Sequence, residues 1–512
     1  MHMRKIAPFL FAIVSPLVLS SCFSFPISVN KEELVAINKY TYHDYTSNNT
    51  FNIDSCPSIG SPKILIIPIW FTDSSNYIKD DEKKEVVRED IQKAYFGTPQ
   101  ETGWHSVSSF YKEESKDKCQ LQGVVSEWYD ISLSSSAFYT KKDNTVSLVK
   151  EATDWYFNNH SEESRTDYDL DGNGYLDGVM LIYGSPDYGA LKDNSCTNMW
   201  AYCYWLQDTS LKNTANPGPN TFFWASYDFM YSSSLALLKT GTKYGSGDTL
   251  FCHIDAHTYI HEMGHVFGLE DYYDYSNQYT PAGGFSMQDY NVGGHDPYSI
   301  MALGWVDPIV PTVSCRFEIG LFQETHDLVL LSNNYTGSPF DEYLLLELYS
   351  PTGLNQFDSW HQYNKKSPYG PSSVGIRLWH IDSRLILLDN GRLASAYFST
   401  NPKQKDYQVA LAFSNTYYDA GDSNSKKYIS PLGETYSDYN IVQLIRNNKT
   451  DTYRPKTFLG ESDLFTFSDS FSLKRFSKQF YRENKMNNGE YLDWSFTITD
   501  FTNNKASISF NR

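Results

Sequence analysis

The sequence is poor in basic residues and, beyond its N-terminal region, lacks any long apolar run. Its 512 residues include 42 Lys and Arg against 61 Asp and Glu, which gives a net charge of −19. We therefore expect neither a phosphate-neutralising surface nor a nucleic-acid partner. No later run approaches the roughly 18 apolar residues of a transmembrane helix. Internal repeats and long low-complexity segments are also missing.

Cysteine is scarce, with seven in the chain, and no two of them have the CxxC spacing of many structural zinc sites. Cys22 belongs to the N-terminal signal described next. An even number of cysteines then remains, which permits disulfides in several connectivities; reduced, buried thiols are the alternative. These cysteines are Cys56, Cys119, Cys196, Cys203, Cys252 and Cys315.

The N-terminus has the pattern of an export signal. Arg4 and Lys5 precede an apolar stretch over residues 6–19, and Leu-Ser-Ser-Cys then ends at Cys22. This ending resembles the bacterial lipobox, which implies a signal peptide over residues 1–21, lipidation of Cys22 and anchoring on the extracytoplasmic side of a bacterial membrane, at the cell surface. An ordinary secretory signal with an incidental cysteine is the alternative. Residues 22–60, rich in Asn, Ser and Thr, are expected to form a tether.

The remaining chain is predicted to fold in two parts. Aromatic residues make up 16% of the sequence, too many for a disordered chain. Helical and strand patterns alternate over residues 61–312, which predicts an α+β (mixed α/β) catalytic domain, whereas residues 313–512 predict a β-rich, β-sandwich-like region. The clearest strands are expected at residues 63–71, 178–183, 342–347, 376–381 and 506–510, and the clearest helix at 80–95.

The decisive motif is HExxHxxGxxD at residues 261–271. On an α-helix, a spacing of four places His261 and His265 on one face, where both can bind one metal ion. Glu262 lies beside that position and can act as general base for water activated by Zn²⁺. Gly268 allows the chain to leave the helix with a positive φ and to bring Asp271 back as a third ligand.

Other polar residues near this motif compete for the same roles. Glu270 is the alternative third ligand, and His253 and Asp255 stand further upstream. His257 lies one helical turn before His261, and we expect it to support the ligands or to lie in solvent, because only the His261 and His265 pair encloses a glutamate.

The motif and several shorter blocks resemble the immune inhibitor A family of secreted bacterial zinc metallopeptidases, whose site is metzincin-like. The resemblance extends over about residues 60–385. It implies a zincin-type catalytic domain, His261, His265 and Asp271 as zinc ligands, Glu262 as the base, and Met287 as the floor of the site. The supporting blocks are residues 107–115, 200–201, 283–287, 295–298, 303–305 and 375–382.

A second motif resembles the first nine positions of a calcium-binding loop. Asp169, Asp171, Asn173 and Asp177 would supply side-chain oxygens and Tyr175 its carbonyl, while Gly174 allows the sharp turn. The twelfth position holds Met rather than Glu, so another group or water must complete a structural Ca²⁺ site. A simple turn before the strand at 178–183 is the alternative.

Two further groups are expected to be structural. His380 and Asp382 lie in a strand pattern, where burial with satisfied hydrogen bonds is favoured over metal ligation. Tyr290 is expected to pack rather than to stabilise an oxyanion.

Three functions fit these observations. The first is a membrane-anchored zinc endopeptidase that acts on proteins or peptides. The second is a non-catalytic surface-binding lipoprotein on a peptidase scaffold, and the third is zinc-dependent hydrolysis of a non-peptide substrate. The intact motif favours the first, because a binding protein has no need of a base beside two metal ligands.

Overall fold

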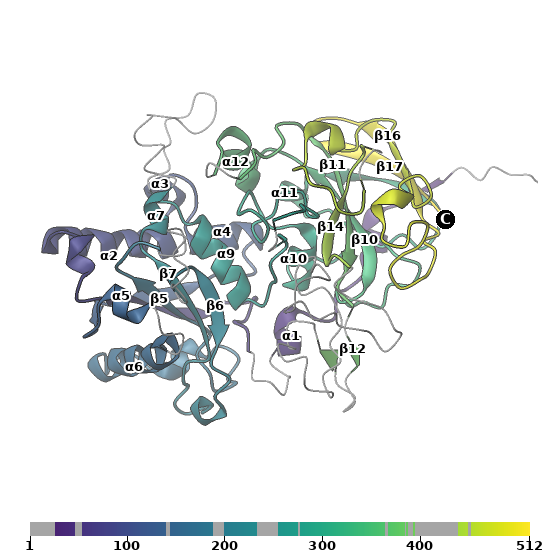
Figure 1. Cartoon of the computed structure of the whole chain (residues 1–512). Helices are drawn as coiled ribbons and strands as arrows, with labels where there is room; N and C mark the ends of the chain where they lie inside the picture. Colours follow the sequence, from purple (N-terminus) through teal and green to yellow (C-terminus); the bar gives the residue numbers. More distant parts are fainter. Residues whose placement is uncertain are drawn as a thin grey trace, which may run out of the picture.

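The structure is a computed structural model of a mixed α/β protein with several sheets (Figure 1). The predicted signal peptide and Cys22 lie outside the described residues, as do Cys196, Cys252 and His253. Within the described parts, no helix is both long and apolar enough to cross a membrane. The described residues are 26–46, 54–139, 144–187, 199–232, 254–274, 277–363, 367–384, 386–387, 393–394, 439–448 and 452–512.

A mostly parallel sheet forms the framework of the first half of the chain. Its strand order is β3-β2-β5-β7-β6, and β4 also pairs with β2. Only β6, at one edge, is antiparallel to its neighbour. The predicted strands at 63–71 and 178–183 are confirmed as β2 and β5. The strands are β2 (Lys63–Trp70), β3 (Gln122–Val125), β4 (Tyr129–Asp130), β5 (Val179–Tyr183), β6 (Tyr202–Trp205) and β7 (Thr221–Ser226).

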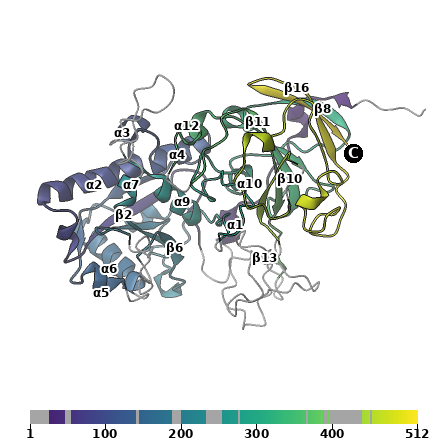
Figure 2. The same ribbon diagram turned by 45° about the horizontal axis from the view of Figure 1, so that its top comes forward.

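Helices cover both faces of this sheet, which is why β2 and β5 are apolar at nearly every position. Ile64 and Ile66 of β2 pack into one apolar cluster, with α2, α4 and α9, while Leu65 and Ile67 pack into another, with α6. Figures 1 and 2 show these helices on opposite sides of the sheet. The helices are α2 (Asp81–Phe96), α3 (Pro99–Thr102), α4 (Val107–Glu114), α5 (Ser135–Phe138), α6 (Asn144–Asn159), α7 (Phe229–Ser232) and α9 (His257–Val266).

The second half is rich in strands, as predicted. One sheet has the order β1-β8-β17-β16-β15 and another β14-β11-β10-β9. Side chains of both sheets meet in a shared apolar cluster. The strands are β1 (Ile27–Ser28), β8 (Cys315–Gly320), β9 (Val329–Leu331), β10 (Glu342–Tyr349), β11 (Gly375–Asp382), β14 (Val442–Ile445), β15 (Ser470–Ser472), β16 (Ser495–Phe501) and β17 (Lys505–Asn511), with a separate pair β12 (Ile386–Leu387) and β13 (Leu393–Ala394).

The four-stranded sheet joins the two halves of the molecule. Leu344 and Leu378 face the cluster shared with the five-stranded sheet, whereas Leu345 and Trp379 belong to the cluster around α9. The core around α9 therefore continues past residue 312, where the sequence predicts a domain boundary. Short helices complete this half: α10 (Pro297–Ala302), α11 (Phe322–Thr325) and α12 (Gln356–Trp360).

The described part of the predicted tether, residues 26–46 and 54–60, packs against the body. Strand β1 pairs with β8, Val35 forms a bridge with Ile309, and the backbone N–H of Asn38 donates to Asp307. The helix α1 (Tyr42–Thr46) carries the buried Tyr42 ring, whose hydroxyl lies 3.0 Å from that of Tyr298. These contacts hold the segment in place, which is not the behaviour of a flexible tether.

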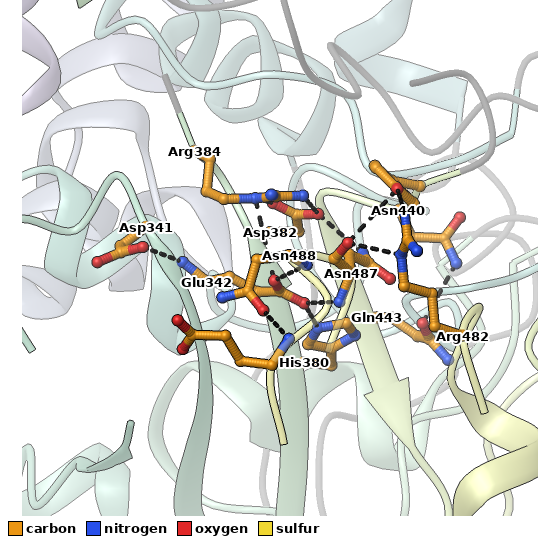
Figure 3. A network of polar contacts seen from close by, with 12 residues as sticks. Asp341, Glu342, His380, Asp382, Arg384, Asn440, Gln443, Arg482, Asn487 and Asn488 are labelled. Carbon is orange, nitrogen blue, oxygen red and sulfur yellow. Dashed lines mark hydrogen bonds and ion pairs between the residues drawn. The ribbon is translucent and has the colours of Figure 1, made fainter. Parts of the chain in front are cut away.

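Polar residues buried in the second half form a hydrogen-bonded network (Figure 3). The Nε2 of His380 lies 2.8 Å from Glu342 Oε1, and Asp382 accepts hydrogen bonds from Arg384 and Asn487. Neither His380 nor Asp382 belongs to a group of described residues that could hold a metal ion. Both residues are buried in hydrogen-bonded positions, as predicted, although His380 Nδ1 has no hydrogen-bond partner among the described residues.

The cysteines within the described ranges are free thiols: Cys56, Cys119, Cys203 and Cys315. Three of these are buried, and burial raises the pKa of the Cys56 thiol well above its usual value. The described cysteines are therefore reduced, and all of them except the half-buried Cys203 are buried.

Candidate metal centre

The helix α9 carries the HExxH motif and lies deep in the molecule. Tyr259, Ile260, Met263 and Val266 are fully buried in the cluster between the first sheet and the four-stranded sheet. Packing surrounds the helix on most sides, and Asp255 Oδ1 accepts the backbone N–H of His257 at its start, so the helix is held in place. A rigid helix fixes the positions of the groups that it presents.

Three predicted ligands converge at one point. The Nε2 atoms of His261 and His265 lie 3.1 Å apart, and Asp271 Oδ1 lies 3.1 Å from the first and 3.2 Å from the second. Tetrahedral coordination with bonds of about 2.0–2.2 Å places ligand atoms roughly 3.3 Å apart. The three atoms therefore have the separations that a metal ion would require, and they form one of the groups that could hold an ion.

The rings of both histidines are oriented by backbone carbonyls. His261 Nδ1 donates to the Met287 carbonyl at 2.8 Å, and His265 Nδ1 donates to the Leu269 carbonyl at 2.7 Å. Because a carbonyl can only accept, each ring carries its proton on Nδ1 and directs the Nε2 lone pair at the common point. Met287, predicted as the floor of the site, is fully buried and acts here through its backbone.

The turn after α9 delivers Asp271, as predicted. Gly268 has a φ of +102°, and the backbone N–H of Leu269 returns to the Gly264 carbonyl at 3.0 Å. A Cβ on Gly268 would lie 3.2 Å from the Tyr42 Cβ, so Tyr42 closes the turn from outside. Glu270, the alternative ligand, is buried but does not belong to the converging group.

The charges of the ligands stabilise one another. Although burial alone would raise it, the pKa of the Asp271 carboxyl is held well below its usual range by His265 and His261. Burial alone would lower the pKa of His265, but the Asp271 carboxylate raises it to about 10. This pocket therefore attracts positive charge, whether as protons or as a metal ion.

Glu262 lies beside the converging ligands. Its side chain is 5% exposed, and its Oε2 has no hydrogen-bond partner among the described residues. Burial raises the pKa of Glu262, while the two histidines act in the opposite direction. A buried carboxylate with a free oxygen and a raised pKa is suited to accept and return a proton.

A cleft of ≈ 300 Å³ opens onto these groups. One side is formed by α9 and Asp271, and the other by the edge strand β6 and the residues before it. The sequence did not single out the β6 side chains, since only the short block at 200–201 carries the resemblance. The residues that line the cleft are Trp200, Ala201, Tyr202, Cys203, His261, Glu262, His265, Glu270, Asp271 and Tyr273.

The prediction for His257 is wrong. Its side chain is 1% exposed; Nδ1 lies 2.7 Å from Asp255 Oδ1, and Nε2 lies 3.3 Å from Asp358 Oδ2. The ring is stacked between Trp104 and Tyr363 at centroid distances of 4.1 and 4.2 Å. It belongs to a separate buried cluster and neither contacts the predicted metal ligands nor lies in solvent.

The aspartate loop brings part of the second predicted group together. One carboxylate oxygen of each of Asp169, Asp171 and Asp177 lies within 4.8 Å of the others. The Asn173 Oδ1 instead accepts the backbone N–H of Tyr175, and its amide donates to Asp171. The three carboxylates could hold a cation, whereas the Asn173 side chain stabilises the turn through its hydrogen bond with the Tyr175 backbone.

Comparison with known proteins gives little further information. No model of a protein family matches the chain, and no curated protein matches it either. Among solved structures, the crystal structure of wild-type OgpA from Akkermansia muciniphila is 11% identical, covers 66% of this chain and 93% of that chain, and has a TM-score of 0.20. This similarity is too low to support a functional argument.

Proposed function

We propose that this protein is an exported zinc-dependent endopeptidase similar to the immune inhibitor A family. The observation that carries the proposal is the convergence of His261 Nε2, His265 Nε2 and Asp271 Oδ1 within 3.2 Å of one another, beside the buried Glu262. Three protein ligands with an open position are typical of catalytic zinc, whereas structural zinc has four.

Two nitrogens and one carboxylate oxygen form a donor set that suits Zn²⁺. A bound Zn²⁺ would supply the electrostatic polarisation of a peptide carbonyl and of water. Glu262 would accept a proton from the attacking water and return it to the leaving amine. Burial raises the pKa of Glu262, which makes its carboxylate a better proton acceptor.

The edge strand β6 would bind the substrate. One side of β6 pairs with β7, and the other lies at the edge of the sheet and lines the cleft. An extended peptide can add to such an edge through backbone hydrogen bonds, which are independent of side-chain identity. This arrangement favours peptides and proteins over other substrates.

The remaining parts of the proposal follow from the sequence. Residues 61–312 would form a zincin-type catalytic domain, and residues 313–512 a β-sandwich-like region. A lipid on Cys22 would anchor the protein at a bacterial cell surface. Asp169, Asp171 and Asp177 would bind a structural Ca²⁺, which is abundant outside the cell.

Protease assays on the full chain test the proposal. The metal-stripped protein should leave unfolded casein intact, and restoring Zn²⁺ should produce fragments visible by gel and mass spectrometry. Asp271→Asn is the control that should remain inactive at the same zinc concentration. Zinc binding without cleavage of casein or of any peptide in a mixed library would contradict the proposal and favour a non-catalytic surface-binding lipoprotein.

A further inference from the structure

A second group of ligand atoms lies where the N-terminal segment meets the aspartate loop. A ring nitrogen of His43 and one carboxylate oxygen each of Asp54 and Asp171 lie within 4.8 Å of one another. His43 belongs to α1, Asp54 precedes β2 in the segment predicted as a tether, and Asp171 belongs to the loop before β5. Three separate parts of the chain therefore supply the group.

The His43 ring is oriented in the same way as the two proposed zinc ligands. Its Nδ1 donates to the Ser55 carbonyl at 2.9 Å, which leaves Nε2 facing Asp171 Oδ2 at 3.2 Å. In the neutral ring, Nε2 and the carboxylate are both acceptors, so a proton or a cation must lie between them. An ion about 2.1 Å from each atom would fit this separation.

Asp54 adds a third, buried donor to the pair formed by His43 and Asp171. It is 6% exposed, and its Oδ1 has no hydrogen-bond partner among the described residues. Its backbone carbonyl accepts hydrogen bonds from Trp205 Nε1, at 3.0 Å, and from the Thr221 hydroxyl, so the residue is held in place. A buried carboxylate facing a second carboxylate is unfavourable unless a proton or a cation lies between them.

Asp171 is also fixed, but it is open to solvent. The backbone N–H of Asn173 donates to its Oδ1 at 3.2 Å and the Asn173 amide to its Oδ2 at 2.8 Å. The side chains of His43 and Asp171 are 18% and 21% exposed, which leaves a path by which an ion can enter. The group thus combines fixed donors with access.

We propose that His43, Asp54 and Asp171 bind a divalent transition-metal ion such as Zn²⁺ or Mn²⁺. The imidazole donor disfavours Ca²⁺ and Mg²⁺, which prefer oxygen ligands throughout, while the two carboxylates suit Zn²⁺ and Mn²⁺. The ion joins the N-terminal segment to the body of the protein. This site is separate from the proposed catalytic zinc and does not depend on that assignment. It shares Asp171 with the group of Asp169 and Asp177 proposed to bind Ca²⁺.

The ion has a structural consequence for the turn that carries Asp271. Tyr42, next to His43, packs against Gly268, and the backbone N–H of Cys56, close to Asp54, donates to the Val266 carbonyl at 2.9 Å. Both contacts lie at the C-terminal end of α9. An ion that holds His43 and Asp54 together therefore braces the end of the helix.

Zinc titration of the metal-stripped full chain tests the proposal. Calorimetry and metal analysis should give two equivalents of Zn²⁺ for the wild type and one for His43→Ala and for Asp54→Asn. His265→Ala should also retain one, and the His43→Ala, His265→Ala double variant should bind none. His160→Ala is the matched control, because His160 also has a carbonyl at Nδ1, from Tyr156, but faces the single carboxylate of Glu127.

Stability measurements complete the test. Zn²⁺ should raise the thermal unfolding temperature of His265→Ala, and this rise should disappear when His43→Ala or Asp54→Asn is added. The proposal would be overturned if His43→Ala and Asp54→Asn both still bound a second equivalent of Zn²⁺ with an affinity within about twofold of the wild type. A single equivalent in the wild type that is lost in His265→Ala would also overturn it.

Discussion

The Nε2 atoms of His261 and His265 face each other at 3.1 Å, although neither nitrogen carries a proton in the neutral ring. Both rings donate from Nδ1 to backbone carbonyls, and Asp271 Oδ1 completes a triangle of acceptors. Three acceptors at such separations repel one another without a positive charge between them. The backbone of the protein thus favours an arrangement that a metal ion stabilises.

Asp271 and Glu270 offer a direct comparison of adjacent carboxylates. Asp271→Asn should lower the zinc affinity by more than the roughly 10- to 100-fold that loss of an outer hydrogen-bond partner costs. Glu270→Gln should change it much less, because Glu270 lies outside the converging group. Competition with a fluorescent zinc chelator measures both affinities. If Glu270→Gln lowered the zinc affinity more than Asp271→Asn did, Glu270 rather than Asp271 would be the third ligand.

Gly268→Ala should destabilise the protein by about 1–3 kcal/mol, since φ is +102° and the added Cβ meets Tyr42. Gly489→Ala is the matched control: φ is +89°, but nothing lies within 4 Å of the added Cβ. Chemical denaturation should show a larger loss for Gly268→Ala and, in addition, weaker zinc binding. Equal losses and unchanged zinc affinity would show that the Tyr42 contact has no effect on the turn.

His257 should make stability depend on pH. Although burial lowers it, Asp358 and Asp255 raise the pKa of His257 from 6.5 to about 9. Because the folded pKa is raised, the stabilisation is complete below about pH 6.5 and is lost as the pH rises to about 9. By linkage, this rise in the pKa of His257 contributes on the order of 3 kcal/mol to the free energy of unfolding.

The difference in unfolding free energy between wild type and His257→Gln measures this effect across that pH range. It should shrink as the pH rises from about 6.5 to about 9. A pH-independent difference for His257→Gln would mean that His257 is neutral in the folded protein.

Strands that are buried on both faces were predictable, because burial makes their sequences continuously apolar. The strand β2 is buried on both faces, so its apolar run is continuous, and β10 and β11 were found for the same reason. The converging ligands were also predictable, because His261, His265 and Asp271 belong to one helix and the turn that follows it. Both signals are local in sequence.

The errors concern contacts between residues far apart in the sequence. His257 pairs with Asp358, 101 positions away, and Asn38 contacts Asp307 at a separation of 269. The polar composition of residues 22–60 predicts a tether, because polar residues that form specific long-range hydrogen bonds look the same as solvated ones. The β6 side of the cleft was missed for a related reason. The order of strands in the sheet, which the sequence does not reveal, places β6 at the edge beside α9.

The central claim is that Glu262 transfers protons and does not bind the metal. Zinc content and casein cleavage should be measured together on the wild type and on Glu262→Gln, which preserves the shape of the side chain. Glu262→Gln should bind zinc with unchanged stoichiometry and cleave casein more slowly by on the order of 10²- to 10⁴-fold. Cleavage at the wild-type rate with zinc bound, or loss of zinc from the variant, would contradict the role assigned to Glu262.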